Sequence, residues 1–378
     1  MDMTSFDSIV AGAGIWGCTL ARRLAEAGRR VLVLEKRTAV GGNCRCEIDP
    51  ETGIEVHTYG SHIFHTKNEK VWAFVNRFTN FNDYRHCVLA NHAGKIYHLP
   101  FGRTLYDEFF GKGNYELPLN DGQNAAVFEA FIKNYTAKQW GMAAEKVDPS
   151  VIRRLKVRDS YSTDYFDDPH QGIPIDGYNR MFERMLDHEN ITVQCNCSLV
   201  FEKGKAKAKG EGEQRINPTI QQSNNQTIYY SGPIDALFNY KYGALPWRTL
   251  NFELETLNCS DYQGNSVVNY PDIDVPYTRI HEFRHYHPEW EAKAKGEGEQ
   301  RTIIMKEFSS AWHPGDEPYY PIATPESTAL LAKYQSDLVR YNQTIQQSNN
   351  PKIICGGRLG GYKYYDMDQA VAAALEVE

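Results

Sequence analysis

Residues 7–43 constrain the fold of this chain more than any other stretch, because they hold a glycine-rich turn between two short apolar segments. Residues 8–11 are typical of a short buried strand, and Gly12, Gly14 and Gly17 follow in a Gly-x-Gly-x-x-Gly pattern. Glycines at these positions permit a tight turn and let the backbone approach a pyrophosphate at the N-terminus of the next helix. The pattern predicts a dinucleotide-binding unit; the alternative is a glycine-rich turn without a ligand.

The residues that follow complete this unit. Residues 18–28 have helical spacing and end in a glycine, and residues 31–34 are typical of a second parallel strand. Glu35 ends that strand about twenty residues after the glycines, where a carboxylate can accept hydrogen bonds from both ribose hydroxyls and would repel a 2′-phosphate. A second glycine pair at 41–42 suits the longer pyrophosphate region of FAD better than NAD.

Length and charge limit the remaining possibilities. The 378 residues predict two or three domains. Because 41 Lys and Arg face 48 Asp and Glu, the net charge of −7 argues against a nucleic-acid partner, and individual arginines must hold any anionic substrate. The first residues have no basic stretch, and no run reaches about eighteen apolar residues, so we expect no secretion, no membrane span and a cytoplasmic protein.

Cysteines and histidines give weaker signals. The close cysteine pairs, 44/46 and 195/197, have neither zinc-site spacing nor a suitably placed histidine, so we expect reduced thiols and no metal. His62 and His65 flank an apolar pair, without an acid at triad spacing or a metal-binding helix pattern. A structural role or an imidazole beside a flavin ring are the two interpretations that remain.

Residues 125–140 have the pattern of a helix. Phe128, Phe131, Ile132 and Tyr135 share one face at helical spacing, which is most simply a core stripe, although the polar end of the helix suits a pocket wall. Residues 111–123 are a loop by composition, and residues 88–99 are typical of a hairpin.

Two further segments carry groups that could hold phosphate. Residues 152–165 combine four basic residues with aromatic ones, which could be a phosphate-binding segment or a solvated basic face. Near the C-terminus, an apolar strand runs into Gly356 and Gly357, and Asp366 is placed to cap the closing helix. If the first and last segments build one nucleotide site, the rest of the chain is inserted between them.

Many short motifs of this chain together resemble the bacterial UDP-galactopyranose mutases, in order and over nearly the whole length. The strings Lys-Gln-Trp-Gly and Tyr-Lys-Tyr-Tyr-Asp-Met are close to diagnostic. The motifs occupy residues 12–17, 35–37, 41–43, 59–65, 99–101, 135–141, 171–174, 232–235, 276–279, 315–321, 356–359 and 362–367.

The resemblance implies an FAD enzyme that interconverts UDP-galactopyranose and UDP-galactofuranose without net redox change. In that family, N5 of the reduced flavin attacks the anomeric carbon, UDP leaves, the sugar recloses as a furanose and UDP returns. It also implies a homodimer. The implied fold is α/β, with a Rossmann-like FAD-binding domain (1–80, 170–235 and 350–378), an inserted helical domain (100–168) and a sheet-based substrate domain (81–99 and 236–349).

The resemblance also assigns roles to residues that match the family motifs. Arg158 and Arg279 would clamp the diphosphate, and His62 would lie near the flavin ring. The expected substrate-binding residues are Phe131 and Tyr135 for the uracil, Trp140 beside the sugar, and Tyr165, Tyr320 and Tyr365. The expected cofactor-binding residues are Gly12, Gly14, Gly17, Glu35, Lys36, Gly42, Asn43, Arg358, Asp366 and Met367.

The chain departs from the family pattern in several places. Asp159 directly follows Arg158, so we expect it to compete for that arginine, and residues 111–127 replace a longer helical stretch. Residues 205–215 recur at 292–301, and residues 219–225 recur at 344–350. We interpret these repeats as solvent-exposed loops that replace the loops usual in the family, as in an engineered or generated variant.

Two other classes stay open from the sequence. The glycine motif and Glu35 alone would also fit an FAD oxidoreductase of the amine-oxidase type. A third possibility is a protein that binds flavin or a UDP-sugar without turnover, because the altered segments 111–127, 204–226, 291–301 and 343–350 leave activity open.

Overall fold

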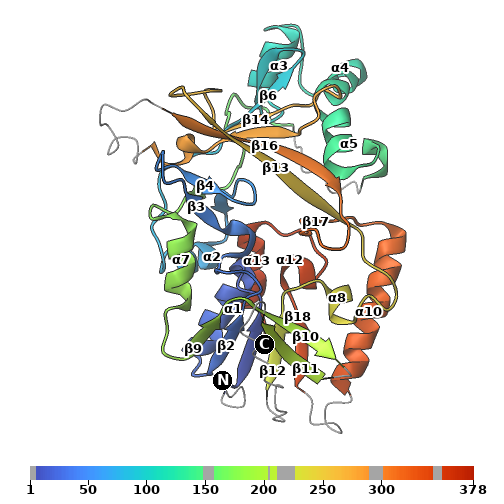
Figure 1. Ribbon diagram of the computed structural model, residues 1–378. Coiled ribbons are helices and arrows are strands. Elements are labelled where there is room, and N and C mark those ends of the chain that lie inside the picture. The colour runs from blue at the N-terminus through green and yellow to red at the C-terminus, as the bar shows by residue number, and fades with distance from the viewer. Residues whose placement is uncertain (1–5, 148–156, 203–204, 211–225, 289–300, 344–350) are drawn as a thin grey trace.

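The computed structural model describes residues 6–147, 157–202, 205–210, 226–288, 301–343 and 351–378. Its first layer is a parallel five-stranded sheet in the order β18-β12-β1-β2-β9, at the bottom of Figure 1. The strands are β1 (Ser8–Ala11), β2 (Val31–Leu34), β9 (Ile191–Gln194), β12 (Thr227–Tyr230) and β18 (Lys352–Cys355).

The predicted strand-turn-helix-strand unit is confirmed at the centre of this sheet. Every residue of β1 and β2 is buried, as their unbroken apolar sequence requires in a parallel sheet covered on both faces. Between them, α1 (Ile15–Glu26) packs beside α7 (Gly177–Leu186) and α13 (Met367–Leu375). Asp366 begins α13 with a capping box, which confirms its predicted cap.

A second sheet of seven strands lies above the first in Figure 1, in the order β17-β13-β16-β15-β14-β6-β7. The predicted hairpin is confirmed, with a turn at Ala93 and Gly94 that takes positive φ angles of 51° and 75°. The strands are β6 (Val88–His92), β7 (Lys95–Leu99), β13 (Trp247–Leu257), β14 (Val267–Asn269), β15 (Arg279–Glu282), β16 (Thr302–Ala311) and β17 (Tyr320–Pro321).

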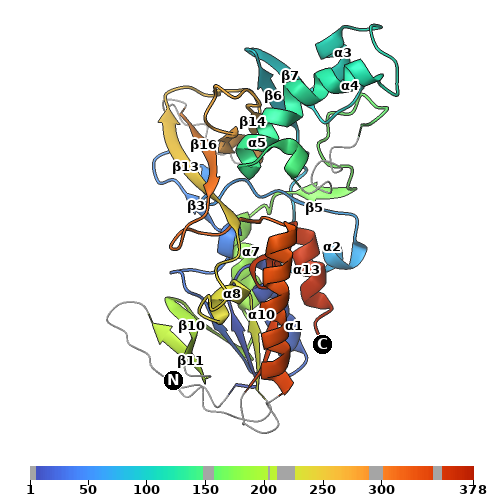
Figure 2. The same cartoon turned by 90° about the vertical axis from the view of Figure 1, so that its right-hand side faces the viewer.

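Helices from the middle of the chain pack at the far end of the second sheet (Figures 1 and 2). They are α3 (Arg103–Phe110), α4 (Asp121–Val127), the π-helical turn η3 (Phe128–Lys133) and α5 (Asn134–Trp140). The predicted helix starts a few residues early, because Asn120 forms a capping box with Gln123. The π turn breaks the 3.6-residue periodicity, so residues before and after it point in different directions from those the sequence pattern predicts.

Part of one repeat is a strand, contrary to the predicted loop. β11 (Lys205–Gly210) pairs antiparallel with β10 (Cys197–Glu202), because its alternating Lys and Ala residues fit a two-faced ribbon. Residues 292–300, 219–225 and 344–350 of the repeats lie outside the described residues.

Short elements join these layers. The strands are β3 (Cys46–Ile48), β4 (Glu55–His57), β5 (Phe64–Thr66) and β8 (His170–Gly172). The helices are α2 (Glu69–Val75), α8 (Ile234–Leu237), α10 (Pro325–Gln343) and α12 (Gly357–Gly360), with 3₁₀ turns η2 (Gly42–Cys44), η4 (Ala144–Lys146) and η5 (Phe283–Tyr286). Among the described residues, no helix is long and apolar enough to cross a membrane.

Candidate functional site

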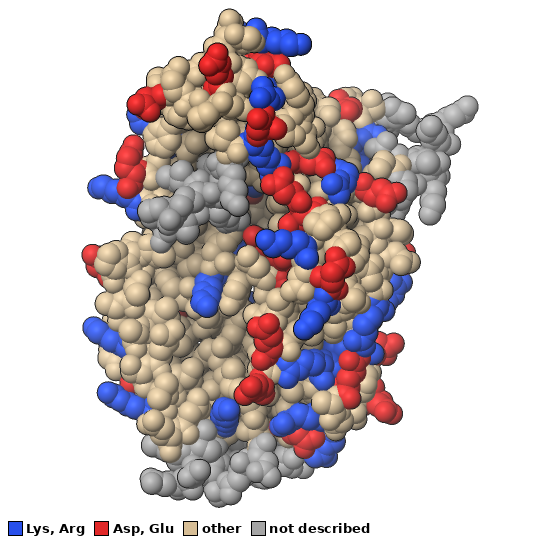
Figure 3. All heavy atoms as spheres, turned by 180° about the vertical axis from the view of Figure 1, so that it is seen from behind, with Lys and Arg blue, Asp and Glu red and all other residues tan. Residues whose placement is uncertain are grey.

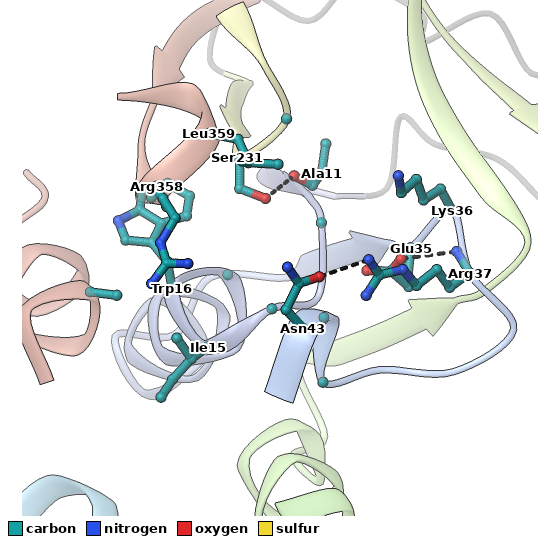
Figure 4. Close-up of a pocket in the computed structure, with 18 of the residues that line it drawn as sticks. Ala11, Ile15, Trp16, Glu35, Lys36, Arg37, Asn43, Ser231, Arg358 and Leu359 are labelled. Carbon is teal, nitrogen blue, oxygen red and sulfur yellow. Dashed lines mark hydrogen bonds between the residues drawn. The ribbon is translucent and has the colours of Figure 1, made fainter. Parts of the chain in front are cut away.

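A cavity of about 280 Å³ lies at the carboxyl ends of the parallel strands. The turn after β1, the end of β2, the η2 turn and α12 all contribute to its wall (Figure 4). All the residues predicted to bind the cofactor line it: Gly12, Gly14, Gly17, Glu35, Lys36, Gly42, Asn43, Arg358, Asp366 and Met367. His62, predicted beside a flavin ring, lines it as well.

The glycines are required because backbone segments approach each other closely there. A Cβ atom on Gly17 would lie 2.0 Å from the carbonyl oxygen of Gly12, and one on Gly42 would lie 2.8 Å from Cα of Gly14. Gly12 and Gly42 also have positive φ angles, of 105° and 58°. The two glycine motifs, about thirty residues apart in the chain, therefore form one continuous cradle of exposed backbone.

Glu35 is held in place without using all its hydrogen-bonding capacity. Its carboxylate accepts hydrogen bonds from the Ala13 amide at 2.7 Å and the Arg37 amide at 2.9 Å. An ionised carboxylate has about four acceptor positions, so room remains for ribose hydroxyls. Figure 4 shows Glu35 and Arg37 at the same end of the cavity, where Arg37 also donates to Asn43 at 2.8 Å.

Glu317 closes this end of the cavity with a charge network. It pairs with Lys36 at 2.5 Å and with Arg37 at 3.0 Å. Burial raises the pKa of Glu317, but the charges of Lys36 and Arg37 outweigh burial and lower it below its ordinary value. The segment between β16 and β17 thus contacts the dinucleotide-binding unit through an ionised side chain.

His62 lines the cavity in a defined protonation state. Burial lowers its pKa to about 4, and the positive charge of Arg358 acts in the same direction. Its Nδ1 lies 2.6 Å from the carbonyl oxygen of Gly60 and must donate to it. The neutral ring therefore presents an unprotonated Nε2, which can accept a hydrogen bond from a bound group.

A second cluster surrounds Arg279 on β15. Its guanidinium donates to the Tyr135 hydroxyl at 2.6 Å and forms an ion pair with Glu307 at 3.3 Å. The phenols of Tyr165 and Tyr320 are near enough to interact electrostatically with Arg279. Three of the tyrosines predicted to bind substrate are thus gathered around one predicted diphosphate-binding arginine.

Aromatic side chains connect this cluster with the cavity. Arg358 lies over the rings of Tyr320 and Tyr364, at 5.7 and 5.3 Å from their centroids. Trp140 packs against the same two tyrosines at 6.1 and 6.3 Å. Tyr365, expected on the substrate side, lines the cofactor cavity together with Asp366 and Met367. Sequence reasoning missed the contacts of Tyr364 with Arg358 and Trp140, because the motif does not show which of two neighbouring tyrosines faces them.

Phe131 is a core residue and not a wall of this cluster. It is buried against Tyr97, Phe109 and His92, with ring centroids 5.2 to 5.5 Å apart. Phe131 thus packs in an aromatic core, whereas the hydroxyl of Tyr135 accepts a hydrogen bond from Arg279. Phe131 lies within the π turn and Tyr135 follows it, so the two residues do not have the angular relation of a regular α-helix.

Arg158 is held by its own loop. It donates to the carbonyl oxygens of Asp164 and Tyr165 at 2.6 and 2.8 Å, and pairs with the Asp167 carboxylate at 3.0 Å. The expected competition from Asp159 is wrong, because Asp159 pairs with Arg103. In this conformation the guanidinium of Arg158 is hydrogen-bonded to carbonyl oxygens of its own loop. Of the two predicted diphosphate-binding arginines, only Arg279 has the predicted substrate-binding tyrosines around it.

Surface charge supports a site built from individual cations. On the face shown in Figure 3, basic and acidic side chains are interspersed. Since the net charge is −7, the overall field would not attract an anionic ligand, and only local cations such as Arg279 and Arg358 could do so.

Comparisons with known proteins agree with this arrangement. A family model described as UDP-galactopyranose mutase matches residues 130–364. The probable UDP-galactopyranose mutase of Klebsiella pneumoniae is 36% identical, over 99% of this chain and 94% of its own length. The chain belongs to the UDP-galactopyranose mutase family.

Other relatives extend the comparison. The dTDP-fucopyranose mutase of Escherichia coli is also 36% identical, over 97% of this chain and 96% of its own. A model for an NAD(P)-binding Rossmann-like domain matches residues 10–78. The crystal structure of a reduced UDP-galactopyranose mutase shares the fold, with a TM-score of 0.68 and 16% identity over 98% of this chain and 92% of that one. The predicted family, enzyme class and fold class are therefore confirmed.

Sequence reasoning missed the acidic partner of Arg279, which is Glu307. Glu307 lies opposite Arg279 in the antiparallel register of β15 and β16 and is 2% exposed. Burial raises its pKa, but Arg279 and a hydrogen bond from His281 lower it to about 2, so Glu307 is ionised. Only strand register reveals this pair, because 28 residues separate the two in the chain.

Buried histidines predict an acid-sensitive fold. Burial lowers the pKa of His86 from 6.5 to about 3, and Arg279 acts in the same direction. Between these values the unfolded chain binds a proton that the folded state does not, so stability is full above about pH 6.5 and falls as the pH drops toward 3. Each such imidazole lowers the unfolding free energy by at most about 1.4 kcal/mol per pH unit.

Urea unfolding at pH 7 and pH 4.5 measures this effect. The variant His86→Gln is expected to lose less unfolding free energy than the wild type over that interval. His98→Gln is the matched control, because His98 is 41% exposed in its side chain and pairs with Glu108 at the surface. An identical loss in His86→Gln and wild type would contradict a neutral buried His86.

Proposed function

We propose that this chain interconverts UDP-galactopyranose and UDP-galactofuranose, with FAD bound in the cavity at the end of the parallel sheet. The observation that carries the proposal is the continuity of two sites. Arg358 lines the cofactor cavity and also lies over Tyr320, whose phenol belongs to the Arg279 cluster. A cationic, aromatic site for a nucleotide-sugar thus adjoins a site for a dinucleotide.

The cavity fits FAD by the chemistry of its wall. The glycine cradle leaves no room for side chains where a pyrophosphate would lie, and Glu35 keeps acceptor positions for ribose hydroxyls. When bound and reduced, FAD supplies the nucleophilic nitrogen for the anomeric carbon of the sugar. We propose that His62 accepts a hydrogen bond at the flavin edge through its unprotonated Nε2.

The chain's own residues bind and orient the nucleotide-sugar. We propose that Arg279 contacts the diphosphate and stabilises the negative charge that grows on it as the bond to the sugar breaks. The Tyr135 hydroxyl holds the guanidinium through its hydrogen bond. Burial lowers the pKa of Arg279, but the negative charge of Glu307 outweighs burial and keeps the guanidinium charged. Trp140 and Tyr320 provide flat apolar surface for the sugar.

A substrate panel tests the proposal. Purified protein reconstituted with FAD and reduced with dithionite is expected to convert UDP-galactofuranose to UDP-galactopyranose, as followed by chromatography. Conversion of dTDP-fucofuranose in its place would assign the activity that the Escherichia coli relative's name describes. Peroxide formation from amines would favour an amine-oxidase type of enzyme, and FAD or UDP binding without any turnover would show a binding protein. Either of these two outcomes would contradict the proposal.

A further inference from the structure

A chain of buried polar contacts runs from Arg279 to the loop that carries His62. Glu307 pairs with Arg279 through Oε1 at 3.3 Å, and its Oε2 lies 3.0 Å from Nε2 of His281. Nδ1 of His281 lies 2.5 Å from Oγ of Ser61. His281 and Glu307 are 1% and 2% exposed, so these groups satisfy one another and not water.

The hydrogen bonds of this chain fix the proton positions on His281. The Tyr286 hydroxyl donates to Oγ of Ser61, so the Ser61 proton can point to Nδ1 of His281. The other ring nitrogen, Nε2, then carries the imidazole proton and donates to Glu307. Burial lowers the pKa of His281 below its ordinary value, which agrees with a neutral ring.

The strand geometry explains why one carboxylate meets both residues. Arg279 and His281 are two positions apart on β15, so their side chains lie on the same face, and Glu307 faces them from β16. Glu307 therefore faces Arg279 with Oε1, which also accepts from the Thr278 hydroxyl at 3.3 Å, and His281 with Oε2. The Tyr135 hydroxyl is the one hydrogen-bond acceptor that the described residues give the Arg279 guanidinium.

We propose that His281 is a positioning residue that keeps Glu307 from forming a two-point pair with Arg279. Carboxylate and guanidinium groups pair most strongly through two parallel hydrogen bonds. Because His281 occupies the second oxygen of Glu307, most N–H groups of the guanidinium stay available for a diphosphate. Ser61 supports His281 from the loop that begins at Gly60. This inference rests on the proposed function, since it assigns the diphosphate to Arg279.

A series of substitutions at position 281 distinguishes a hydrogen bond to Glu307 from a purely steric role of His281 in the core. His281→Leu removes both nitrogens, and His281→Asn places its amide near Nδ1, close to Ser61 but short of Glu307. His281→Gln places its amide near Nε2 and can donate to Glu307. We expect UDP affinity, measured by titration calorimetry on the FAD-loaded enzyme, to fall about tenfold in the Leu and Asn variants, which is about 1.4 kcal/mol. The Gln variant should bind UDP almost as the wild type does.

A double-mutant cycle with Glu307→Gln tests the proposed route. If His281 acts through Glu307, His281→Leu should change UDP affinity much less in the Glu307→Gln background than alone. Flavin absorbance and thermal melting confirm folding in each variant, and if the Leu variant does not fold, the comparison of Asn with Gln decides. His98→Leu removes a surface His–Glu pair and serves as the control.

The outcomes distinguish this inference from the proposed function. Equal UDP affinity in wild type, Leu, Asn and Gln variants would overturn the role of His281 while leaving the function intact. Equal losses in Asn and Gln variants would show a steric role only and would also overturn it. A wild-type enzyme that does not bind UDP would instead contradict the proposed function.

Discussion

Replacement of Arg279 by alanine is expected to lower kcat/KM for UDP-galactofuranose by roughly 10²–10³-fold, while the flavin absorbance stays unchanged. The guanidinium is the cation around which Tyr135, Tyr165 and Tyr320 gather, and it does not line the cofactor cavity. A cation stabilises the negative charge that grows on a leaving diphosphate most strongly when the site is buried and the cation is already oriented.

Two further variants make this test specific. Arg279→Lys keeps the charge but loses the planar group that bonds Tyr135, so we expect an intermediate loss of turnover. Arg180→Ala is the control, because the Arg180 side chain is 67% exposed and pairs only with its helix neighbour Glu183 among the described residues. Thermal melting must accompany both, since Arg279→Ala leaves the buried Glu307 without its cation. Unchanged turnover in Arg279→Ala would refute the assigned diphosphate contact.

Replacement of Gly17 by valine is expected to abolish FAD binding, so that the purified protein is colourless even with excess FAD. A Cβ atom at this position would lie 2.0 Å from the carbonyl oxygen of Gly12, which is backbone and cannot rotate away. The first glycine turn must therefore open, and the amide groups that would face the pyrophosphate move with it. Absorbance of the purified protein and fluorescence titration with FAD measure the loss.

A glycine outside the cavity provides the matched control. Gly94 in the hairpin turn has a φ of 75°, but a Cβ atom there would meet nothing within 4 Å. We expect Gly94→Ala to cost about 1 kcal/mol of stability through backbone strain and to leave FAD binding unchanged. A yellow Gly17→Val protein with a normal flavin spectrum would contradict the assignment of this turn to the cofactor.

Local patterns in the sequence were sufficient for the dinucleotide-binding unit. The run from β1 to β2, the glycine turn and Glu35 depend on neighbours within about thirty residues, and the structure has all of them where the pattern predicts. The cap at Asp366 and the hairpin at Gly94 are equally local. Backbone conformation and capping act over one turn or one strand, so residue type alone determines them.

The Arg279 site was predicted only in part. The resemblance to a family identified Arg279, Tyr135, Tyr165, Tyr320 and Trp140, and the structure brings these together. It gave no reason to separate Tyr364 from Tyr365. It also assigned Phe131 to the uracil, and in the structure Phe131 is buried in an aromatic cluster.

The sequence by itself determined the strand-turn-helix unit, its glycine cradle and the family to which the chain belongs. Only the tertiary structure decided that Glu307 and His281 stand beside Arg279, that Arg158 is bound by its own loop, and that Phe131 lies in a core. The physical reason is the distance along the chain over which each kind of interaction acts. Glycine conformation and apolar alternation act between near neighbours, whereas a buried ion pair exists only when strand register brings distant residues face to face.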